Sequence, residues 1–344
     1  MSSNGDGRFV NPAIGVLSGE AAGQKVADKP DERAATEGSA PFDVYGRPPE
    51  AREEEEGVTY YDRPVLKEPV WEWVVPAYFH TGGIAGAAAV LGAAAQARGA
   101  PRNLVSKCRW TATAAIVVST GLLIYDLGRR ERWLNMLRVF RPTSPMSVGS
   151  WVLAASGGAA SSAAMLSRSD GFLGSLGDLS GAGAGLLGLP LAGYTAVLVS
   201  NTAVPAWKEP RRSLPFLFVA SAVNAAASLL ELMPCDDDEA RILQRFGTTG
   251  RTAELFAGVL VEREVAKFPR TRAAYEHGLA GALWSAGEAL GATSLLLGLL
   301  PKRTRVKRFA SGSVGGAAAA AMKLAVFYAG KASARDPRAT FEAL

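Results

Sequence analysis

The sequence predicts an all-α polytopic membrane protein with about eight transmembrane helices and a polar N-terminal tail. Three observations predict this class. Long runs of Ala, Leu, Val and Gly that carry almost no charge recur along the chain. Charged residues are concentrated in the first 70 residues and in short connectors, so the mean hydropathy of only +0.10 hides the apolar runs. Basic residues flank these runs, which is typical of loops at a membrane surface.

Composition excludes several other classes of protein. The two cysteines, Cys108 and Cys235, lie far apart, which excludes a disulfide framework, a thiolate zinc site and a self-contained iron–sulfur site. The two histidines, His80 and His277, are too few for chemistry that needs four imidazoles. We therefore expect no haem or metal bound by this chain itself. The chain has a net charge of +5, and its basic residues flank apolar runs. This pattern indicates contact with a membrane surface rather than with nucleic acid.

The two ends of the chain differ from its middle. Residues 1–70 are rich in Gly, Ala, Asp, Glu and Pro, with an acidic run at 53–56, and predict a largely disordered tail. A short docking segment is expected at 60–69. Residues 1–20 lack a basic stretch followed by an apolar core, so no signal peptide is predicted. Residues 331–344 form a second polar tail.

Hydropathy places the predicted spans in order along the chain. The sixth is the weakest because it contains Arg251 and Glu254. Gly-rich and Ala-rich stretches such as 82–86 and 181–185 predict close helix packing, although a bias toward Ala and Gly in the genome would add to them. The predicted spans are 73–96, 108–125, 148–167, 180–204, 214–233, 246–261, 278–300 and 309–330.

An even number of spans puts both termini on one side of the membrane, here called side one. Its loops and tails carry roughly 18 Lys and Arg near the membrane, against about 12 on side two. This bias favours cytoplasmic termini. The basic cluster at 302–308 on side two argues against that orientation.

The connector between the second and third spans, residues 126–151, is rich in unusual residues. Asp126 ends an apolar helix at the membrane edge, where an unpaired acid is costly, and the connector's own charges are near enough to pair with it. Trp133 and Trp151 are typical of interfacial anchors. Ser144 or Ser147 is expected to cap the third helix, with Pro145 in its first turn. A salt-bridged interfacial hairpin and a direct functional role are both open.

This connector resembles the signature of the polysulfide reductase membrane-subunit family, also called NrfD-like, which reads close to D-L-G-R-P-E-R-F and then S-P-M-S-x-G-S-W. The chain departs from it at Arg130, where Pro is usual, and at Trp133, where Phe is usual. The matching residues are Asp126, Leu127, Gly128, Arg129, Glu131, Arg132, Ser144, Pro145, Met146, Ser147, Gly149, Ser150 and Trp151.

The resemblance extends over about residues 70–330, with further motif matches at 193–196, at 205–207 and at 78–80. It implies two four-helix bundles, the first over 71–212 with a quinone site and the second over 213–330. It also implies that the chain anchors an iron–sulfur subunit, usually with a molybdopterin catalytic subunit, and exchanges electrons with menaquinone or ubiquinone.

The motif match assigns Tyr194 as the tyrosine that contacts the quinone, with Thr195 beside it. Counting residues from side one places His80 at a depth of roughly 12 Å and Tyr194 at roughly 16 Å. Tyr78, His80 and Tyr194 can donate to quinone carbonyls, and Asp126 can supply protons. The alternatives are an interhelical hydrogen bond for Tyr194 and simple packing for His80.

Three charged residues, Glu254, Glu288 and Lys323, fall within the later spans at similar predicted depth. Ionisable groups inside a membrane are functional candidates, so these three are candidates for a proton path. A structural ion pair between Glu288 and Lys323, with Glu254 beside it, is slightly favoured. Glu231, with Asn224 deeper in the same span, is a weaker candidate for proton exit.

The leading functional prediction is a membrane anchor that interacts with quinone in a respiratory oxidoreductase complex, in the bacterial inner membrane. With no redox centre of its own, it would receive electrons from a partner and reduce or oxidise quinone, with proton translocation as a possible consequence. The principal alternative is a passive anchor without a quinone site. A haem b anchor and a secondary transporter built from repeats are less favoured.

Overall fold

The computed structural model describes residues 9–10, 17–18, 66–300 and 304–342. The chain divides into two units, Met1–Arg63 and Pro64–Leu344. In the first unit the described residues form a two-stranded antiparallel ladder of β1 (Phe9–Val10) and β2 (Leu17–Ser18). The predicted disorder and docking segment of the tail fall almost wholly outside the described residues.

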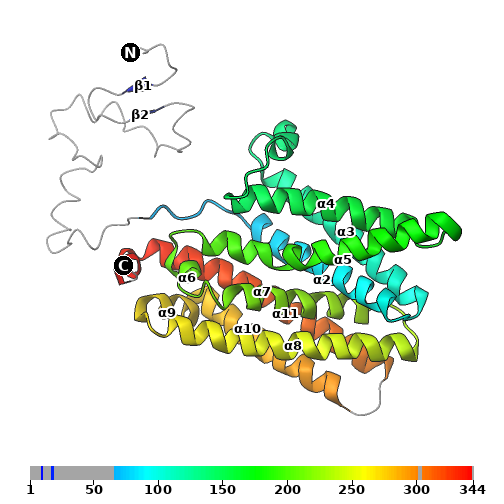
Figure 1. Ribbon diagram of the computed structural model, residues 1–344. Helices are drawn as coiled ribbons and strands as arrows, with labels where there is room; N and C mark the ends of the chain where they lie inside the picture. The colour runs from blue at the N-terminus through cyan, green and yellow to red at the C-terminus, as the bar shows by residue number, and fades with distance from the viewer. Residues whose placement is uncertain (1–8, 11–16, 19–65, 301–303, 343–344) are drawn as a thin grey trace, which may run out of the picture. The chain divides into compact units, whose positions relative to one another are not determined.

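The described part of the second unit contains only helices, arranged side by side as Figure 1 shows. Four are short connecting helices: η3 (Arg130–Leu137), α6 (Pro205–Lys208), α9 (Pro269–Glu276) and α12 (Pro337–Glu342). The helices of 18 residues or more in this part are α2 (Val74–Ala97), α3 (Arg102–Asp126), α4 (Pro145–Met165), α5 (Gly171–Ser200), α7 (Leu214–Glu231), α8 (Asp237–Val265), α10 (Gly278–Leu299) and α11 (Arg305–Arg335).

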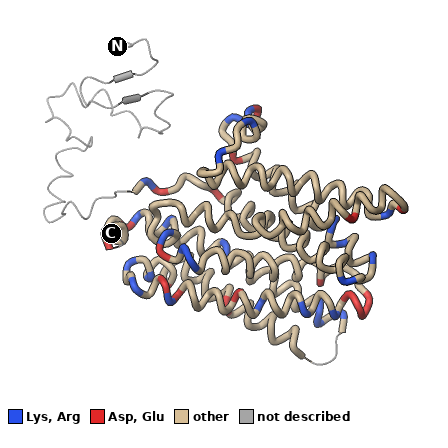
Figure 2. The backbone as a smooth tube through the Cα atoms, viewed as in Figure 1, with Lys and Arg blue, Asp and Glu red and all other residues tan. Residues whose placement is uncertain are grey.

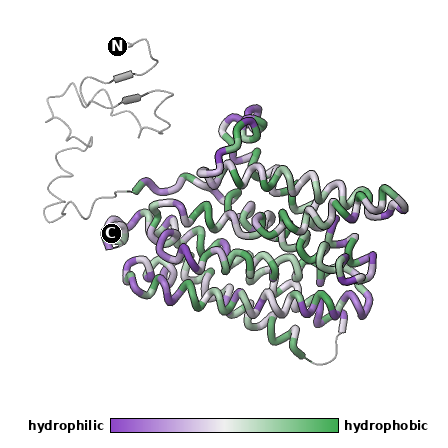
Figure 3. The backbone as a smooth tube through the Cα atoms, in the orientation of Figure 1, coloured by the Kyte–Doolittle hydropathy of each residue, from purple (hydrophilic) through white to green (hydrophobic). Residues whose placement is uncertain are grey.

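Six of these helices are long and apolar enough to cross a membrane, namely α2, α3, α5, α7, α10 and α11. The remaining two, α4 and α8, coincide with the third and sixth predicted spans. The α4 sequence is rich in Ser and Gly, and α8 carries many charged residues. Charged residues gather near the helix ends (Figure 2), while the middle of the helices is largely apolar (Figure 3). The chain is therefore a multi-pass membrane protein.

Local sequence signals set several helix ends. The Asp236 carboxylate accepts from the Glu239 backbone N–H at 2.8 Å, and the Glu239 carboxylate accepts from the Asp236 backbone N–H at 3.2 Å, which forms a capping box at the start of α8. Thr304 caps α11 in a similar way by accepting from Lys307 N at 3.3 Å. After α2 the chain turns at Gly99, whose φ of +63° suits a residue without Cβ.

The long helices pack in two sets. In the first half, α2 contacts α3 and α5, and α4 contacts α3 and α5. In the second half, α7 contacts α8 and α11, and α10 contacts α8 and α11. The two halves meet where α2 and α5 pack on α7 and where α11 reaches α2.

Close approach of small residues was predicted, and the α2–α5 contact shows it. A Cβ added to Gly86 would lie 2.6 Å from Gly188 O, and one added to Gly188 would lie 2.5 Å from Gly86 O. The two backbones can meet at this distance only because both residues are glycine. Large apolar side chains instead cover the outer faces, for example Phe172, Leu179 and Leu186 on α5, as expected of surfaces that face lipid.

Candidate functional site

The signature connector begins where α3 ends, at Asp126, and runs to the first turn of α4. Ser144 is the N-cap of α4 and accepts from Ser147 N at 3.4 Å, with Pro145 as the first helical residue, so the predicted cap is confirmed. The Ser147 hydroxyl has a second role. It donates to Val139 O at 3.2 Å and accepts from Arg141 N at 3.0 Å, which folds the connector back onto the start of α4.

The connector exposes aromatic and basic side chains at this end of the helices. Trp133 and Trp151 are each 38% exposed, and Trp151 makes an edge-to-face contact with Phe140 at 6.3 Å between ring centroids. The Arg130 guanidinium lies 4.5 Å from the centroid of the Tyr125 ring. Exposed tryptophan beside arginine at a helix end suits the boundary between lipid and water, as predicted for this segment. The motif residues Arg129, Glu131 and Arg132 are exposed here as well.

An open groove lies between the start of α2 and the end of α3, at side one. Asp126 lines it, together with Glu72 and Val74 from the α2 side and residues 127–131 of the connector. The signature therefore forms one wall of a cleft whose other wall is the segment leading into α2 and the first residue of that helix. This arrangement places the Asp126 carboxylate where it is accessible from side one.

Two tyrosines lie deeper along the same helices. Tyr78 of α2 is one turn beyond Val74 and makes an edge-to-face contact with Tyr194 of α5 at 6.3 Å between ring centroids. Tyr78 is 5% exposed and its hydroxyl has no hydrogen-bond partner, whereas Tyr194 is half-buried. A buried hydroxyl without a partner is rare in proteins and calls for an explanation.

Tyr194 rests on the signature itself. A Cβ added to Gly149, the glycine of S-P-M-S-x-G-S-W, would overlap the Tyr194 ring. Glycine at this position of α4 therefore makes the room that the ring occupies. Thr195, the next residue of α5, is buried at 2% exposure. The structure thus brings Tyr78, Tyr194 and the α4 part of the signature together, although these residues are far apart in sequence.

His80 lies on a different side of α2 from Tyr78, because two residues along a helix rotate the side chain by about 200°. Its Nδ1 is buried without a hydrogen-bond partner, and the ring is within electrostatic range of Lys323 on α11. The partner of Tyr194 on α2 is therefore Tyr78, and His80 is oriented toward the second half of the molecule.

The predicted ion pair between Glu288 and Lys323 is wrong. Lys323, only 1% exposed, donates to Phe79 O of α2 at 2.9 Å and lies 4.7 Å from the centroid of the Phe218 ring. The charged group that acts on Lys323 electrostatically is Glu254. Glu288 is half-buried and lies against Glu262 of α8. The prediction compared depths in the membrane, and depth does not fix the direction in which a side chain points around its helix.

A buried chain of polar groups connects α7 and α8 instead. Asn224 Nδ2 donates to Glu254 at 2.5 Å and to Gly315 O at 3.1 Å. Ser228 donates to Asn224 Oδ1 at 3.2 Å and accepts from Arg251 at 3.3 Å. Arg251 ends the chain by binding both carboxylate oxygens of Glu231, at 2.6 and 3.2 Å. The members of this chain are at most 3% exposed.

Sequence reasoning missed the role of Arg251. It noted the residue only because a charge weakens the sixth span, and it treated Glu231 as a candidate for proton exit. The signal was present, since an arginine within an apolar stretch implies a buried acid on a neighbouring helix. A second missed cluster lies in the first half, where the buried Arg109 binds Asp178 at 2.7 Å and Gln96 at 2.9 Å.

The fold and this site define a multi-pass helical membrane protein with the signature connector at one end of its first half and buried charges in its second half. A model of the polysulfide reductase family, of NrfD type, matches residues 59–335. The chain belongs to this family, as the signature indicated. A comparison with curated proteins finds no match. Membership of the family indicates a membrane subunit of a redox complex.

Proposed function

We propose that this chain is the membrane anchor and quinone-interacting subunit of a respiratory oxidoreductase complex. It would exchange electrons between a partner iron–sulfur subunit and menaquinone or ubiquinone, with a molybdopterin subunit as the catalytic partner. One observation carries the proposal. The first part of the family signature lines the side-one groove, and Gly149 in its second part lies against the Tyr194 ring.

The architecture that we propose has eight spans in two four-helix bundles, with α4 and α8 crossing the membrane beside the six more apolar helices. The packing of α2 to α5 with one another, and of α7, α8, α10 and α11 with one another, supports it. Internal ion pairs and small residues make α8 and α4 compatible with a membrane interior. The excess of Lys and Arg on side one supports cytoplasmic termini in a bacterial inner membrane.

The residues present fit a quinone headgroup. A quinone takes up two electrons and two protons to become a quinol. The unpartnered Tyr78 hydroxyl and the Tyr194 hydroxyl are the donors that would hold its carbonyl oxygens, since the two rings are in contact. Asp126, in the open groove nearer side one, would exchange protons between the site and water. His80 is oriented toward the second half, so it would influence the quinone site only indirectly, through Lys323 and α2.

The proposal is tested on the whole complex by replacing the two tyrosines. Tyr194→Phe and Tyr78→Phe each remove one donor, so we expect quinone-linked turnover to fall by about fivefold or more, as for loss of one hydrogen bond of about 1 kcal/mol. Electron transfer from the catalytic partner to a water-soluble dye should not change. The matched control is Tyr328→Phe, which alters a half-buried tyrosine on α11 in the second half.

The alternative function, a passive anchor, makes the opposite prediction. If both variants retain full quinone-linked turnover, and no quinone is extracted from the purified complex, the chain holds the complex in the membrane without a quinone site. Identification of the subunits that co-purify with the full chain tests the proposed iron–sulfur and molybdopterin partners directly.

A further inference from the structure

One face of α8 carries polar groups through the thickness of the second half. Arg251, Glu254, Gly258 and Glu262 follow one another at spacings of three and four residues, so they share a face of the helix. Arg251 and Glu254 are buried, and Glu262 lies at side one. An apolar face would suffice to pack α8 on its neighbours, so this stripe needs another explanation.

We propose that the stripe is a proton path whose central binding site is Glu254, open toward side one through Glu262 and Glu288 and closed toward side two by the Arg251–Glu231 pair. The ligand is the proton itself. The inference rests on the proposed function in one respect, because quinone turnover would supply the energy that moves protons along the path.

Glu254 has the features of a proton-binding site. It is 2% exposed, one carboxylate oxygen accepts from Asn224, and Oε1 makes no hydrogen bond, although the Ser221 hydroxyl lies near the carboxylate. The free oxygen is a position where a proton can bind and be given up. Lys323 of α11 lies within electrostatic range of the Glu254 carboxyl group.

Access from side one runs along the same face. Glu288 of α10 lies across from Gly258, where an added Cβ would be 3.6 Å from Glu288 Oε1 and 3.6 Å from Met322 Cε. One turn further, Glu262 accepts from Trp284 Nε1 at 2.9 Å and lies against Glu288. Both carboxylates line a pocket at side one, whose other wall is formed by α9. Glu276 also lines this pocket, together with Arg263 and Arg272, so the carboxylates outnumber the arginines at this opening.

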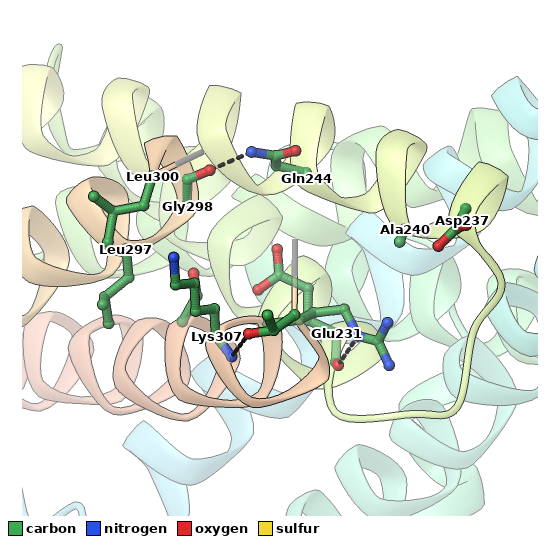
Figure 4. Close-up of a pocket in the computed structure, with 11 residues that line it drawn as sticks. Glu231, Asp237, Ala240, Gln244, Leu297, Gly298, Leu300 and Lys307 are labelled. Atoms are coloured by element: carbon green, nitrogen blue, oxygen red, sulfur yellow. Dashed lines mark hydrogen bonds between the residues drawn. The ribbon is translucent and has the colours of Figure 1, made fainter. Parts of the chain in front are cut away.

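Toward side two the path is closed. Arg251 binds both oxygens of Glu231, and beyond this pair lies a pocket that Glu231 and Gln244 line, shown in Figure 4. Gln244 donates to Gly298 O across that pocket. This buried ion pair lies between Glu254 and side two, and its two hydrogen bonds hold both side chains in place. Release to side two therefore requires the pair to separate.

Glycine residues keep space beside these polar groups. A Cβ at Gly247 would lie 2.9 Å from both Arg251 Nη1 and Glu231 Oε1. A Cβ at Gly315 would lie 2.5 Å from Ser228 Oγ and 2.9 Å from Asn224 Oδ1. These glycines face side-chain oxygens and nitrogens, whereas Gly86 and Gly188 face backbone. A side chain at Gly247 or Gly315 would therefore disturb the buried polar chain as well as the contact between helices.

The path also touches the quinone half. Lys323 donates to the carbonyl of Phe79, the residue next to Tyr78, and a Cβ at Gly83 would lie 2.9 Å from Lys323 Nζ. A displacement of α2 during quinone binding would therefore move Lys323 relative to Glu254. In the step that we propose, a proton from side-one water binds the Glu254 carboxylate, and the same proton later leaves toward side two. No electrons are exchanged in this step.

The test uses the complete complex in sealed vesicles, with protons moved per electron measured separately from turnover. Glu254→Gln should abolish proton movement beyond that of quinone chemistry while turnover in uncoupled vesicles continues, and Glu254→Asp should restore it. Glu288→Gln should lower it. The matched control is Glu239→Gln, a buried carboxylate of α8 that is paired with Lys107 and lies off the stripe. An unchanged ratio in Glu254→Gln, or no excess movement in the wild type, overturns the proposal.

A second measurement needs no turnover and separates this proposal from the quinone site. Infrared difference spectra of the complex across a pH titration should contain a buried carboxyl band that is lost in Glu254→Gln and kept in Glu239→Gln. If the Tyr194→Phe experiment shows that the chain has no quinone site, this band would still report proton binding at Glu254. If the band is absent from the wild type, Glu254 does not bind a proton and the path fails.

Discussion

The two halves of this protein differ in how the polar groups of their candidate sites are paired. In the first half, the buried Tyr78 hydroxyl has no hydrogen-bond partner. In the second half, Arg251, Glu231, Asn224 and Ser228 bind one another in a closed chain. Unpaired donors suit a site that receives a ligand, whereas paired charges suit a region that must hold charge inside a membrane.

The strongest way to break this comparison is to unpair the charges of the second half. Arg251→Met leaves Glu231 buried at 3% exposure without its partner, so we expect a loss of about 3–5 kcal/mol in the free energy of unfolding. The thermal unfolding midpoint of the purified protein in detergent would report it. The double variant Arg251→Met with Glu231→Gln should recover most of the loss, because no unpaired charge remains.

The matched control for that prediction is Arg241→Met on the same helix. Arg241 pairs with Asp238, and both side chains are more than half exposed, so the change should be about 1 kcal/mol or less. Equal effects of Arg251→Met and Arg241→Met would show that the buried pair contributes no more than a surface pair.

Hydropathy predicted the long helices in their correct order, because a span needs a continuous apolar stretch of sufficient length. It predicted their ends less well. The helix predicted at 246–261 runs from Asp237 to Val265, and the one predicted at 309–330 runs from Arg305 to Arg335. Backbone hydrogen bonding continues into charged residues such as those of the Asp236 capping box, where hydropathy no longer indicates a span.

Side-chain partners were less predictable than helices. The match to the family motif located Tyr194 and the signature, and the Ser144 cap was visible from local sequence. The depth argument paired Glu288 with Lys323 and gave His80 and Tyr194 a similar depth. In the structure, Glu254 is the acid that acts electrostatically on Lys323, and Tyr78 is the side chain that contacts Tyr194. Depth follows from counting residues, but the direction around each helix depends on how neighbouring helices pack.

A smaller effect is expected from filling space in the first half. Gly149→Ala would place a methyl group against the Tyr194 ring, so we expect a loss of about 1–3 kcal/mol in stability, together with lower quinone-linked turnover as the ring is displaced. Gly158→Ala on the same helix is the control, since no atom lies within 4 Å of an added Cβ. It should leave turnover unchanged. Similar turnover in both variants would show that Gly149 is not needed to position Tyr194 for quinone-linked turnover.

The smallest expected effect concerns the contact between the halves at side one. Glu68, just before α2, accepts from Arg335 of α11 at 2.7 and 2.9 Å and pairs with Lys331 at 3.2 Å. The Arg335 hydrogen bonds lower the pKa of Glu68 below its ordinary value of 4.5. The stability that this pairing contributes is therefore present above the unfolded pKa and is lost as the pH falls through the lower folded value.

Because the pair is partly exposed and screened by solvent, Glu68→Gln should cost about 1 kcal/mol or less at neutral pH. The difference in unfolding midpoint between Glu68→Gln and wild type should shrink as the pH drops below the ordinary glutamate range, and also at high salt. Lys67→Gln, which changes an exposed neighbour, is the control. A difference that persists at low pH would mean that Glu68 acts through packing and not through charge. In that case the contribution of Glu68 to the contact between the halves would come from packing, and high salt would not lower the unfolding midpoint through this residue.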